Sequence, residues 1–356
     1  MENHIVASFG PGGKYSRHSE GAFLRMNDGG IYFAYSRFTG SASDAAPSNI
    51  AAMVSYDEGE TWSEPETVVK ASEHDTKNIM SVSLMRMLNG DLGLFYIVKA
   101  SKTINRIVLA RSQDEGKTFY RKTVCTLSNR EGYYVLNNDR VERLASGRLI
   151  MPLAFHRGGH DENRAAYFDG RAFDCFLYSD DDGETWDEGR ETVFLNATHT
   201  RTGFQEPGVI ELKNGVLWGY ARTDMMYQYE FFSMDSGETW TAAQASRFTS
   251  PPSPMKIKRH PETDDLYAVW NPIPNYNGRY TSRAGWGRTP MVWAVSKDDG
   301  RTWSDQKIIE DHPEHGYCYP ALFFTNDTAM LVAYCAGGPA DGACLARLSI
   351  QKVYIG

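Results

Sequence analysis

Long cations, carboxylates and phenols stand at both ends of six apolar, alternating segments of this sequence. The residues that precede the segments include Arg17, Asn78, Asn138 with Asp139, Gln205 with Glu206, Ser253, and Tyr317 with Tyr319. Those that follow them are Arg37, Lys99, His156, Arg222, Asn271 and Tyr334. Cations that converge on one point repel one another unless an anion lies between them. If the fold gathers these residues, they predict a site for a carboxylate-bearing or otherwise anionic ligand.

Each of the six segments is typical of a β-hairpin, because apolar and polar residues alternate on both sides of a turn that favours residues such as Gly and Asn. The hairpins cover 23–37, 84–98, 141–155, 209–222, 257–270 and 321–334. A hairpin places the start of its first strand beside the end of its second. We therefore expect the polar residues at the hairpin ends to gather on one face.

A second repeat, Ser-x-Asp-x-Gly-x-Thr followed by Trp or Phe, occurs five times, at 55–62, 112–119, 179–186, 233–240 and 296–303. The spacing between successive Asp residues runs from 54 to 67 residues, a period typical of propellers and solenoids. The motif suits a hairpin turn: Asp accepts hydrogen bonds from turn amides, Gly permits a positive φ, and the aromatic ring packs between neighbouring sheets. Its Asp residues are interpreted as structural.

Together the two repeats predict an all-β, six-bladed β-propeller with about 59 residues per blade, as one domain over residues 1–356. No linker or low-complexity segment interrupts the repeat. The sixth hairpin is followed only by residues 344–356, without the motif. We expect this last blade to accept a strand from the N-terminus, which closes the ring.

Composition excludes several classes of function. Hydrophobic residues make up 41% and charged residues 23%, as in a globular protein with a core, and the net charge of −8 gives no basic field for nucleic acid. The sequence contains no run of 18 apolar residues, which a membrane-spanning helix would need.

The start of the chain shows no signal peptide, and the five Cys form no CxxC pair. We therefore expect reduced thiols in a cytoplasmic protein, although a chain with its signal peptide removed would look the same. The nine His lack ligand spacing, so no metal or other cofactor is expected.

The five motifs are similar to the Asp-boxes (BNR repeats) of the sialidase, or neuraminidase, superfamily, and the order of polar residues resembles that of bacterial exo-sialidases over essentially the whole chain. The resemblance implies a glycoside hydrolase that releases a terminal acidic sugar, sialic acid or a related ulosonic acid, with retention of configuration. It also implies three arginines around the sugar carboxylate, namely Arg17, Arg222 and Arg288. Arg279 and Arg283 compete with Arg288, and Arg17 is not followed by the Ile-Pro of the family motif.

The same resemblance implies the catalytic residues. Tyr319 would be the nucleophile, Glu206 its base, and Asp44 the acid that protonates the leaving oxygen and later activates water. Tyr317 is the rival of Tyr319 and a substrate-binding candidate, and Arg37 matches the arginine ahead of the loop that carries the acid. A phenol suits this substrate because a carboxylate nucleophile would be repelled by the carboxylate beside the anomeric carbon. With an ordinary pKa near ~10 the phenol needs a base beside it.

Five further residues have no clear counterpart in sialidases: Asn78, Asn138, Asp139, Arg140 and His156. They are substrate-pocket candidates, or buried polar groups that bond to loop backbone. As pocket residues they favour a different acidic ring, such as Kdo or a uronic acid. A polysaccharide lyase that uses His156 or Tyr319, and a non-catalytic propeller that binds glycans, remain alternatives. The expected partner is a glycan or glycoconjugate with a terminal acidic sugar.

Overall fold

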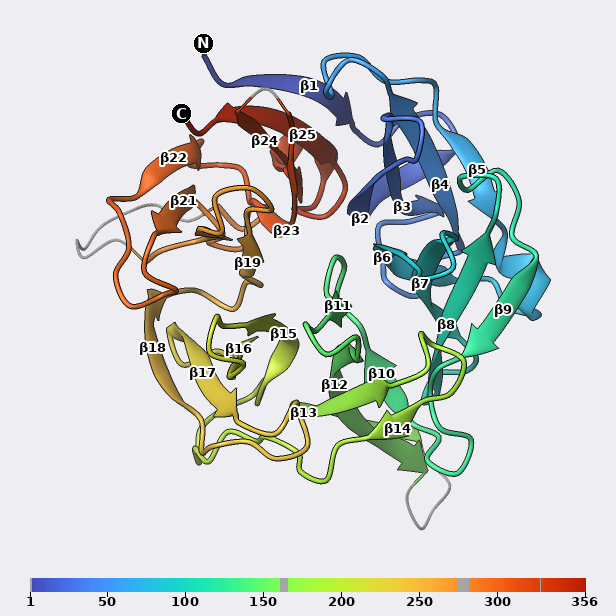
Figure 1. The fold of residues 1–356 in the computed structure, drawn as a ribbon. Helices are drawn as coiled ribbons and strands as arrows, with labels where there is room; N and C mark the ends of the chain where they lie inside the picture. Colours follow the sequence, from blue (N-terminus) through green and yellow to red (C-terminus); the bar gives the residue numbers. More distant parts are fainter. Residues whose placement is uncertain (1, 161–165, 274–281, 327) are drawn as a thin grey trace.

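The computed structural model describes residues 2–160, 166–273, 282–326 and 328–356. They form six antiparallel sheets around a central axis, with one strand of each sheet next to the axis (Figure 1). The predicted all-β, six-bladed β-propeller is confirmed. The described residues form no α-helix, and their helical turns are two short 3-10 segments, Ala71–His74 and Pro339–Asp341.

From the axis outwards, the first two blades each hold four strands. The first consists of β2 (Tyr15–Arg25), β3 (Ile31–Thr39), β4 (Ser48–Ser55) and β5 (Glu66–Val69). The second consists of β6 (Ile79–Arg86), β7 (Leu92–Lys99), β8 (Asn105–Ser112) and β9 (Arg121–Val124).

The third blade departs from this four-strand pattern, because its inner strand is divided. β10 (Tyr133–Val135) and β11 (Glu142–Arg143) both pair with β12 (Leu149–His160), which is followed by β13 (Ala166–Ser179) and β14 (Asp187–Glu188). The segment between β10 and β11 leaves the ladder and bonds instead to backbone groups of neighbouring blades. The amide of Asp139 donates to the carbonyl of Val82 in β6 at 2.9 Å.

The remaining blades follow the regular pattern. The fourth holds β15 (Gln205–Glu211), β16 (Leu217–Arg222), β17 (Tyr227–Ser233) and β18 (Gln244–Thr249). The fifth holds β19 (Lys256–Arg259), β20 (Leu266–Trp270), β21 (Met291–Ser296) and β22 (Lys307–Glu310). The sixth holds β23 (Cys318–Phe324), β24 (Ala329–Cys335), β25 (Leu348–Tyr354) and, outermost, β1 (His4–Phe9).

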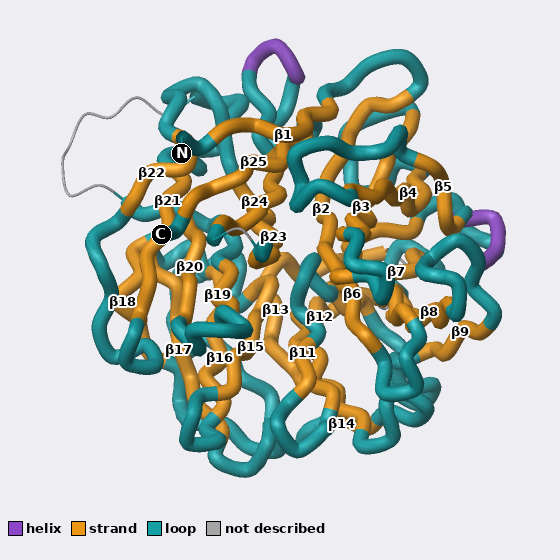
Figure 2. Tube along the Cα trace, turned by 45° about the horizontal axis from the view of Figure 1, so that its top comes forward, coloured by secondary structure: helices purple, strands orange, loops and turns teal. Residues whose placement is uncertain are grey.

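The ring is closed by the first strand of the chain, as the sequence predicts. β1 pairs antiparallel with β25, from His4 opposite Lys352 to Phe9 opposite Leu348. Figure 1 and Figure 2 both show β1 beside β25, with the two termini near this blade. The last blade is therefore built from both ends of the sequence.

An apolar cluster fills each interface between successive blades. At the junction of the first and second blades, for example, Ala34 of β3 and Val82 of β6 share a cluster and are both fully buried. Each blade packs against a neighbour on both of its faces, so nearly every residue of β3, β7 and β24 is buried. The polar residues at the strand ends stand over this packed ring.

The five Asp-boxes all make the same turn. In the first, Asp57 accepts hydrogen bonds from the Thr61 amide at 2.9 Å and from the Ser55 hydroxyl at 2.8 Å. Gly59 adopts a φ of 84°, and the indole of Trp62 donates to its carbonyl at 3.0 Å. The amide contact recurs at Asp114, Asp181, Asp235 and Asp298. The structural role predicted for these aspartates is confirmed.

The boxes lie beside the turns of the inner hairpins. Asp182 of the third box accepts the amide of Leu88 in the turn of the second blade at 3.0 Å, and Asp299 of the fifth box accepts that of Lys213 at 2.8 Å. The open ends of the inner hairpins point the other way. The polar residues singled out above therefore gather on the face opposite the Asp-boxes.

Candidate active site

A β-bulge recurs in the inner strands of four blades and orients one side chain in each. In four blades two residues of the inner strand oppose one residue of the next strand, between Ser19 and Ala22 in the first blade and at the equivalent place in the second, fourth and sixth. The leading residues are Glu20, Ser81, Glu206 and Tyr319, with φ values of 55° to 58°. This left-handed conformation is unfavourable for side-chain-bearing residues, and such strain is concentrated at functional sites. Asp139 of the third blade has a similar φ of 54°.

The bulges bring Tyr319 and Glu206 together across the channel. The Tyr319 hydroxyl donates to Glu206 Oε1 at 2.6 Å, and Arg222 donates to Glu206 Oε2 at 2.7 Å. The side chains of Glu206 and Arg222 are only 10% and 12% exposed. Burial raises the pKa of Tyr319 well above its usual range, and Glu206 raises it further, against the charges of Arg222 and Arg288. The phenol is thus neutral and hydrogen-bonded to a carboxylate.

Asp44 lies at the mouth of the site, in the loop between β3 and β4. Its carboxylate accepts a hydrogen bond from Arg17, and its side chain is 59% exposed. Although its surroundings disfavour the charged form, Arg17 lowers the pKa of Asp44 below its usual value. The second blade holds the loop in place, because Asn78 Nδ2 and Lys99 Nζ donate to the Asp44 carbonyl at 3.0 and 2.7 Å. Asn78 therefore bonds to loop backbone, the alternative left open for it.

Arg17 is completely buried and is surrounded by acceptors of the protein. Its Nε donates to Ser19 Oγ at 2.8 Å, its Nη1 to Asp44 and to the Ala42 carbonyl, and its Nη2 to Glu20 Oε1 at 2.5 Å. Glu20 is also buried, and its other oxygen accepts from Ser81 Oγ at 2.5 Å. The cations at this face are thus partly neutralised by the protein's own carboxylates.

Arg288 lies beside the ring of Tyr319. Its guanidinium donates to the Pro252 carbonyl at 2.8 Å and to the Cys318 thiol at 3.1 Å, and its central carbon lies 5.6 Å from the centre of the Tyr319 ring. Arg283 is exposed, and Arg279 lies outside the described residues. Among the described candidates, Arg288 is the third arginine next to the phenol.

Three predicted pocket residues form a polar layer within the channel. Asn138 Nδ2 donates to the carbonyls of Gly21 and Tyr319 at 2.9 and 3.2 Å, so it ties together two of the bulges. Asp139 lies 3.5 Å from Lys256 and accepts the Leu322 amide at 3.3 Å. Arg140 is buried against the Tyr220 hydroxyl and the Met255 carbonyl. This layer supports the bulged residues from inside the ring.

The other predicted residues are divided between the rim and the core. His156 is at the rim, where it stacks on Phe168 with ring centres 4.9 Å apart, and burial lowers its pKa. Arg37 turns outwards and donates to Thr67 Oγ1 at 2.7 Å. Tyr317 is packed in the apolar cluster between the fifth and sixth blades. Of the two rival phenols, Tyr319 is therefore the one that contacts Glu206.

Sequence reasoning missed Glu20 and Ser81. Both are bulge residues of inner strands, as Glu206 and Tyr319 are. The available signal was position: Glu20 stands in the first hairpin where Glu206 stands in the fourth. It was hidden because a positive φ at a residue other than Gly has no mark in the sequence.

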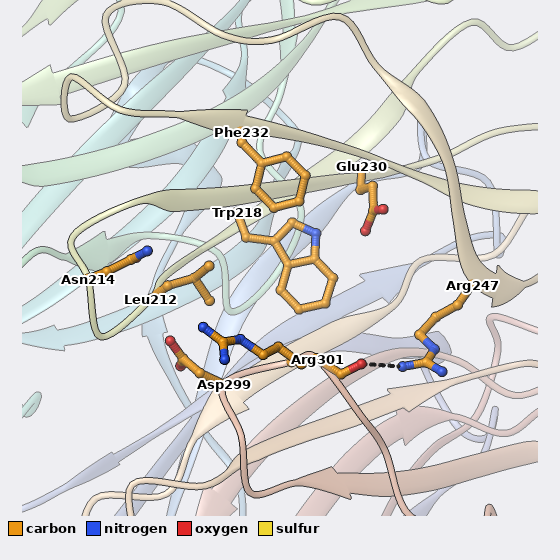
Figure 3. A pocket seen from close by; sticks show the side chains of 9 residues that line it. Leu212, Asn214, Trp218, Glu230, Phe232, Arg247, Asp299 and Arg301 are labelled. Carbon is orange, nitrogen blue, oxygen red and sulfur yellow. Dashed lines mark hydrogen bonds between the residues drawn. The ribbon is translucent and has the colours of Figure 1, made fainter.

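A separate hollow of about 470 Å³ lies between the fourth and fifth blades, lined by residues such as Trp218, Glu230, Arg247 and Arg301 (Figure 3). Arg247 donates to the Arg301 carbonyl at 3.0 Å. The lining includes residues of the fifth Asp-box, so this hollow belongs to the face opposite Tyr319. It is not part of the candidate active site.

Comparison with known proteins agrees with this architecture. The family model of the BNR repeat-like domain matches residues 16–332. The chain belongs to this family. A sialidase from Bacteroides fragilis (strain YCH46) is 26% identical over 224 residues, which cover 60% of this chain and 36% of that protein. The chain thus aligns with about a third of that relative's length.

Solved structures resemble this BNR-repeat propeller over nearly its full length. A protein of unknown function from Dyadobacter fermentans has a TM-score of 0.72 at 17% identity, covering 99% of both chains. The intramolecular trans-sialidase from Ruminococcus gnavus has a TM-score of 0.71 at 14% identity, covering 98% of this chain and 96% of that one. At such identities the likeness shows the fold alone. The chain is a sialidase-like BNR-repeat propeller.

Two features are absent from the described part of this propeller. No helix there is long and apolar enough to cross a membrane. No group of three or more His, Cys, Asp or Glu in the described residues is arranged to hold a metal ion.

Proposed function

We propose that this propeller is a retaining glycoside hydrolase that releases a terminal acidic sugar, sialic acid or a related ulosonic acid, through a tyrosine nucleophile. The observation that carries the proposal is the buried hydrogen bond of 2.6 Å from Tyr319 to Glu206, with Arg222 on the far oxygen of Glu206. A neutral phenol beside a carboxylate base can attack an anomeric carbon that bears its own carboxylate, where a charged nucleophile would be repelled.

In the first step Tyr319 Oη bonds to the anomeric carbon and its proton passes to Glu206. The bond from the anomeric carbon to the leaving oxygen breaks, and Asp44 supplies the proton that this oxygen needs. In the second step Asp44 takes a proton from water, the water oxygen bonds to the anomeric carbon, and the bond from Tyr319 Oη to the anomeric carbon breaks as Glu206 returns the proton to Tyr319. The exposed position of Asp44 at the mouth of the site suits a group that meets both the leaving group and water.

The sugar carboxylate would be held by the arginines around Tyr319. Arg222 retains a buried Nε without a hydrogen-bond partner, and Arg288 lies beside the ring. Arg17 already donates to Asp44 and Glu20, so a ligand carboxylate at Arg17 would be a third anion beside it. Charge-assisted hydrogen bonds contribute about 1.5–3 kcal/mol each, so losing one of these arginines should weaken binding roughly 10- to 150-fold.

The two carboxylates already bound to Arg17 also favour a second candidate, a glycosidase for a uronic acid, whose carboxylate is attached to C5, across the ring oxygen from the anomeric carbon, and not to the anomeric carbon itself. A panel of nitrophenyl glycosides of sialic acid, Kdo, glucuronic acid and galactose separates the possibilities. Release of free ulosonic acid with retained configuration, followed by NMR, supports the first proposal, and release of glucuronic acid supports the second. An unsaturated product absorbing in the ultraviolet, or no reaction with any member of the panel, contradicts both.

A further inference from the structure

Glu20 is a buried carboxylate that the proposed chemistry does not use. Its side chain is 3% exposed, its Oε1 accepts from Arg17 at 2.5 Å and its Oε2 from Ser81 Oγ at 2.5 Å. It is held there by a left-handed φ of 57°, opposite Ser81 with the same φ in the neighbouring blade. Two strained backbone positions thus serve to bring one carboxylate against Arg17.

The ionisable groups around Glu20 come from five elements. Arg17 shares its strand β2, Asp44 lies in the loop after β3, Glu206 is on β15, Tyr319 is on β23, and Arg222 of β16 lies behind Glu206. Burial raises the pKa of Glu20 to about 7, with Asp44 and Glu206 acting in the same direction and Arg17 against them. A small added negative charge is therefore enough to make this carboxylate bind a proton near neutral pH.

A carboxylate ligand at Arg17 adds such a charge. The guanidinium already faces Glu20 on one side and Asp44 on the other, so a third anion there is opposed by both. The opposition is removed when one of the two becomes neutral. Glu20 can become neutral without losing its contacts, because the Ser81 hydroxyl accepts a hydrogen bond as readily as it donates one.

We propose that Glu20 is a proton-accepting counter-ion of Arg17: when the carboxylate of an acidic sugar binds at Arg17, Glu20 takes up one proton from solvent. The inference rests on the proposed function only in that the site receives an acidic sugar. It makes Glu20 a positioning residue that sets the pH range of substrate binding, distinct from the catalytic Tyr319, Glu206 and Asp44.

The affinity for an acidic sugar should fall as the pH rises above neutral. Below about pH 6 Glu20 is already protonated and binding takes up no proton there. Above about pH 7 Glu20 is charged in the free protein and must bind a proton, so the dissociation constant rises by up to about tenfold per pH unit. Asp44, whose pKa is lowered, would take up a proton only in the acid range. The two carboxylates are therefore separated by pH.

The experiment is isothermal titration of the full chain with N-acetylneuraminate at pH 4.5, 6.0, 7.5 and 8.5, in two buffers of different ionisation enthalpy. The dependence of the measured heat on buffer gives the number of protons taken up. The expected result is an uptake that rises from near zero at pH 6.0 towards one at pH 7.5 to 8.5. In Glu20→Gln the uptake at neutral pH disappears, and at pH 8.5 affinity exceeds that of the wild type about tenfold or more.

Three variants make the outcome specific. Glu230→Gln, a half-buried carboxylate on the opposite face whose pKa is also raised, should leave the uptake unchanged. Ser81→Ala removes a hydrogen bond that favours ionised Glu20, so it should shift the uptake to higher pH, and it tests the proposal even if Glu20→Gln does not fold. Uptake that survives in Glu20→Gln and is lost in His156→Gln would assign the proton to His156 and overturn the inference.

The failure of the inference and that of the proposed function give different results. Binding of N-acetylneuraminate with no proton uptake between pH 6.0 and 8.5 overturns the role of Glu20 and leaves the proposed function standing. No binding heat at any pH with N-acetylneuraminate, Kdo or glucuronate contradicts the proposed function itself, and the inference with it.

Discussion

At the scale of single residues, the chemistry depends on one oxygen atom, the hydroxyl of Tyr319. Tyr319→Phe removes that atom and leaves the ring, so the fold should persist while kcat falls on the order of 10³-fold or more. Tyr317→Phe is the matched control, because Tyr317 is buried in the cluster between two blades and should keep near-normal turnover. Steady-state kinetics on an acidic nitrophenyl glycoside measure both. Loss of activity in Tyr317→Phe alone would assign the role of nucleophile to Tyr317 instead of Tyr319.

Asp44 gives a second test at this scale. The Asp44→Ala variant lacks the acid for the leaving oxygen, so kcat/KM on a natural glycan with an alcohol leaving group should fall on the order of 10²- to 10⁴-fold. A nitrophenyl leaving group needs no protonation, and the loss should be much smaller with it. Tyr319→Phe should show no such rescue. Equal losses of Asp44→Ala on both substrates would exclude Asp44 as the acid.

At the scale of the element, each Asp-box is a turn stabilised by one ionised Asp. Three hydrogen bonds from Thr118 and Ser112 lower the pKa of Asp114 to about 2, although its partly buried position acts against this. Because the pKa in the folded state is depressed, the contribution to stability is present above about pH 4 and is lost as the pH falls towards 2.

The Asp114→Asn variant tests this turn. At pH 7 the free energy of unfolding of this variant should be about 1 kcal/mol lower than that of the wild type, and the Tm should fall by about 2–4 °C. The loss is this small because the group is largely solvated. The difference between variant and wild type should shrink between pH 4 and pH 2 in thermal unfolding followed by circular dichroism. A difference that stays constant down to pH 2 would mean that the charge of Asp114 has no part in the turn.

At the scale of the whole molecule, the ring depends on strand β1. Its Val6 and Phe9 pack on the cluster between the sixth and first blades, and its backbone covers the edge of β25. Removing residues 1–9 should lower the Tm by several degrees and expose a strand edge that promotes self-association. Removing residues 1–3 leaves β1 intact and serves as the control. Calorimetry and size-exclusion chromatography measure both effects; an unchanged Tm in the longer truncation would show that closure contributes little.

The sequence by itself determined the architecture, because two independent repeats recur at the same period and each has a local physical cause. The alternation of apolar and polar residues predicts the hairpins, and the Asp-x-Gly turn predicts the Asp-boxes. It also placed the polar residues of the hairpin ends on one face, since antiparallel pairing puts them there. Glu206, Tyr319, Arg222 and Asp44 were named on these grounds together with the family resemblance, and the structure brings Glu206 and Tyr319 into contact.

Only the tertiary structure determined which side chains contact one another on that face. The hydrogen bond between Tyr319 and Glu206 joins residues 113 positions apart in the sequence, and the one between Ser81 and Glu20 joins residues 61 positions apart. Such pairs depend on bulges with positive φ at residues other than Gly, which local sequence does not favour and which the surrounding blades impose. In the same packing Tyr317 is buried in the core, Arg37 points outwards, and Glu20 contacts Arg17. Register and burial across the ring, rather than residue type, made those choices.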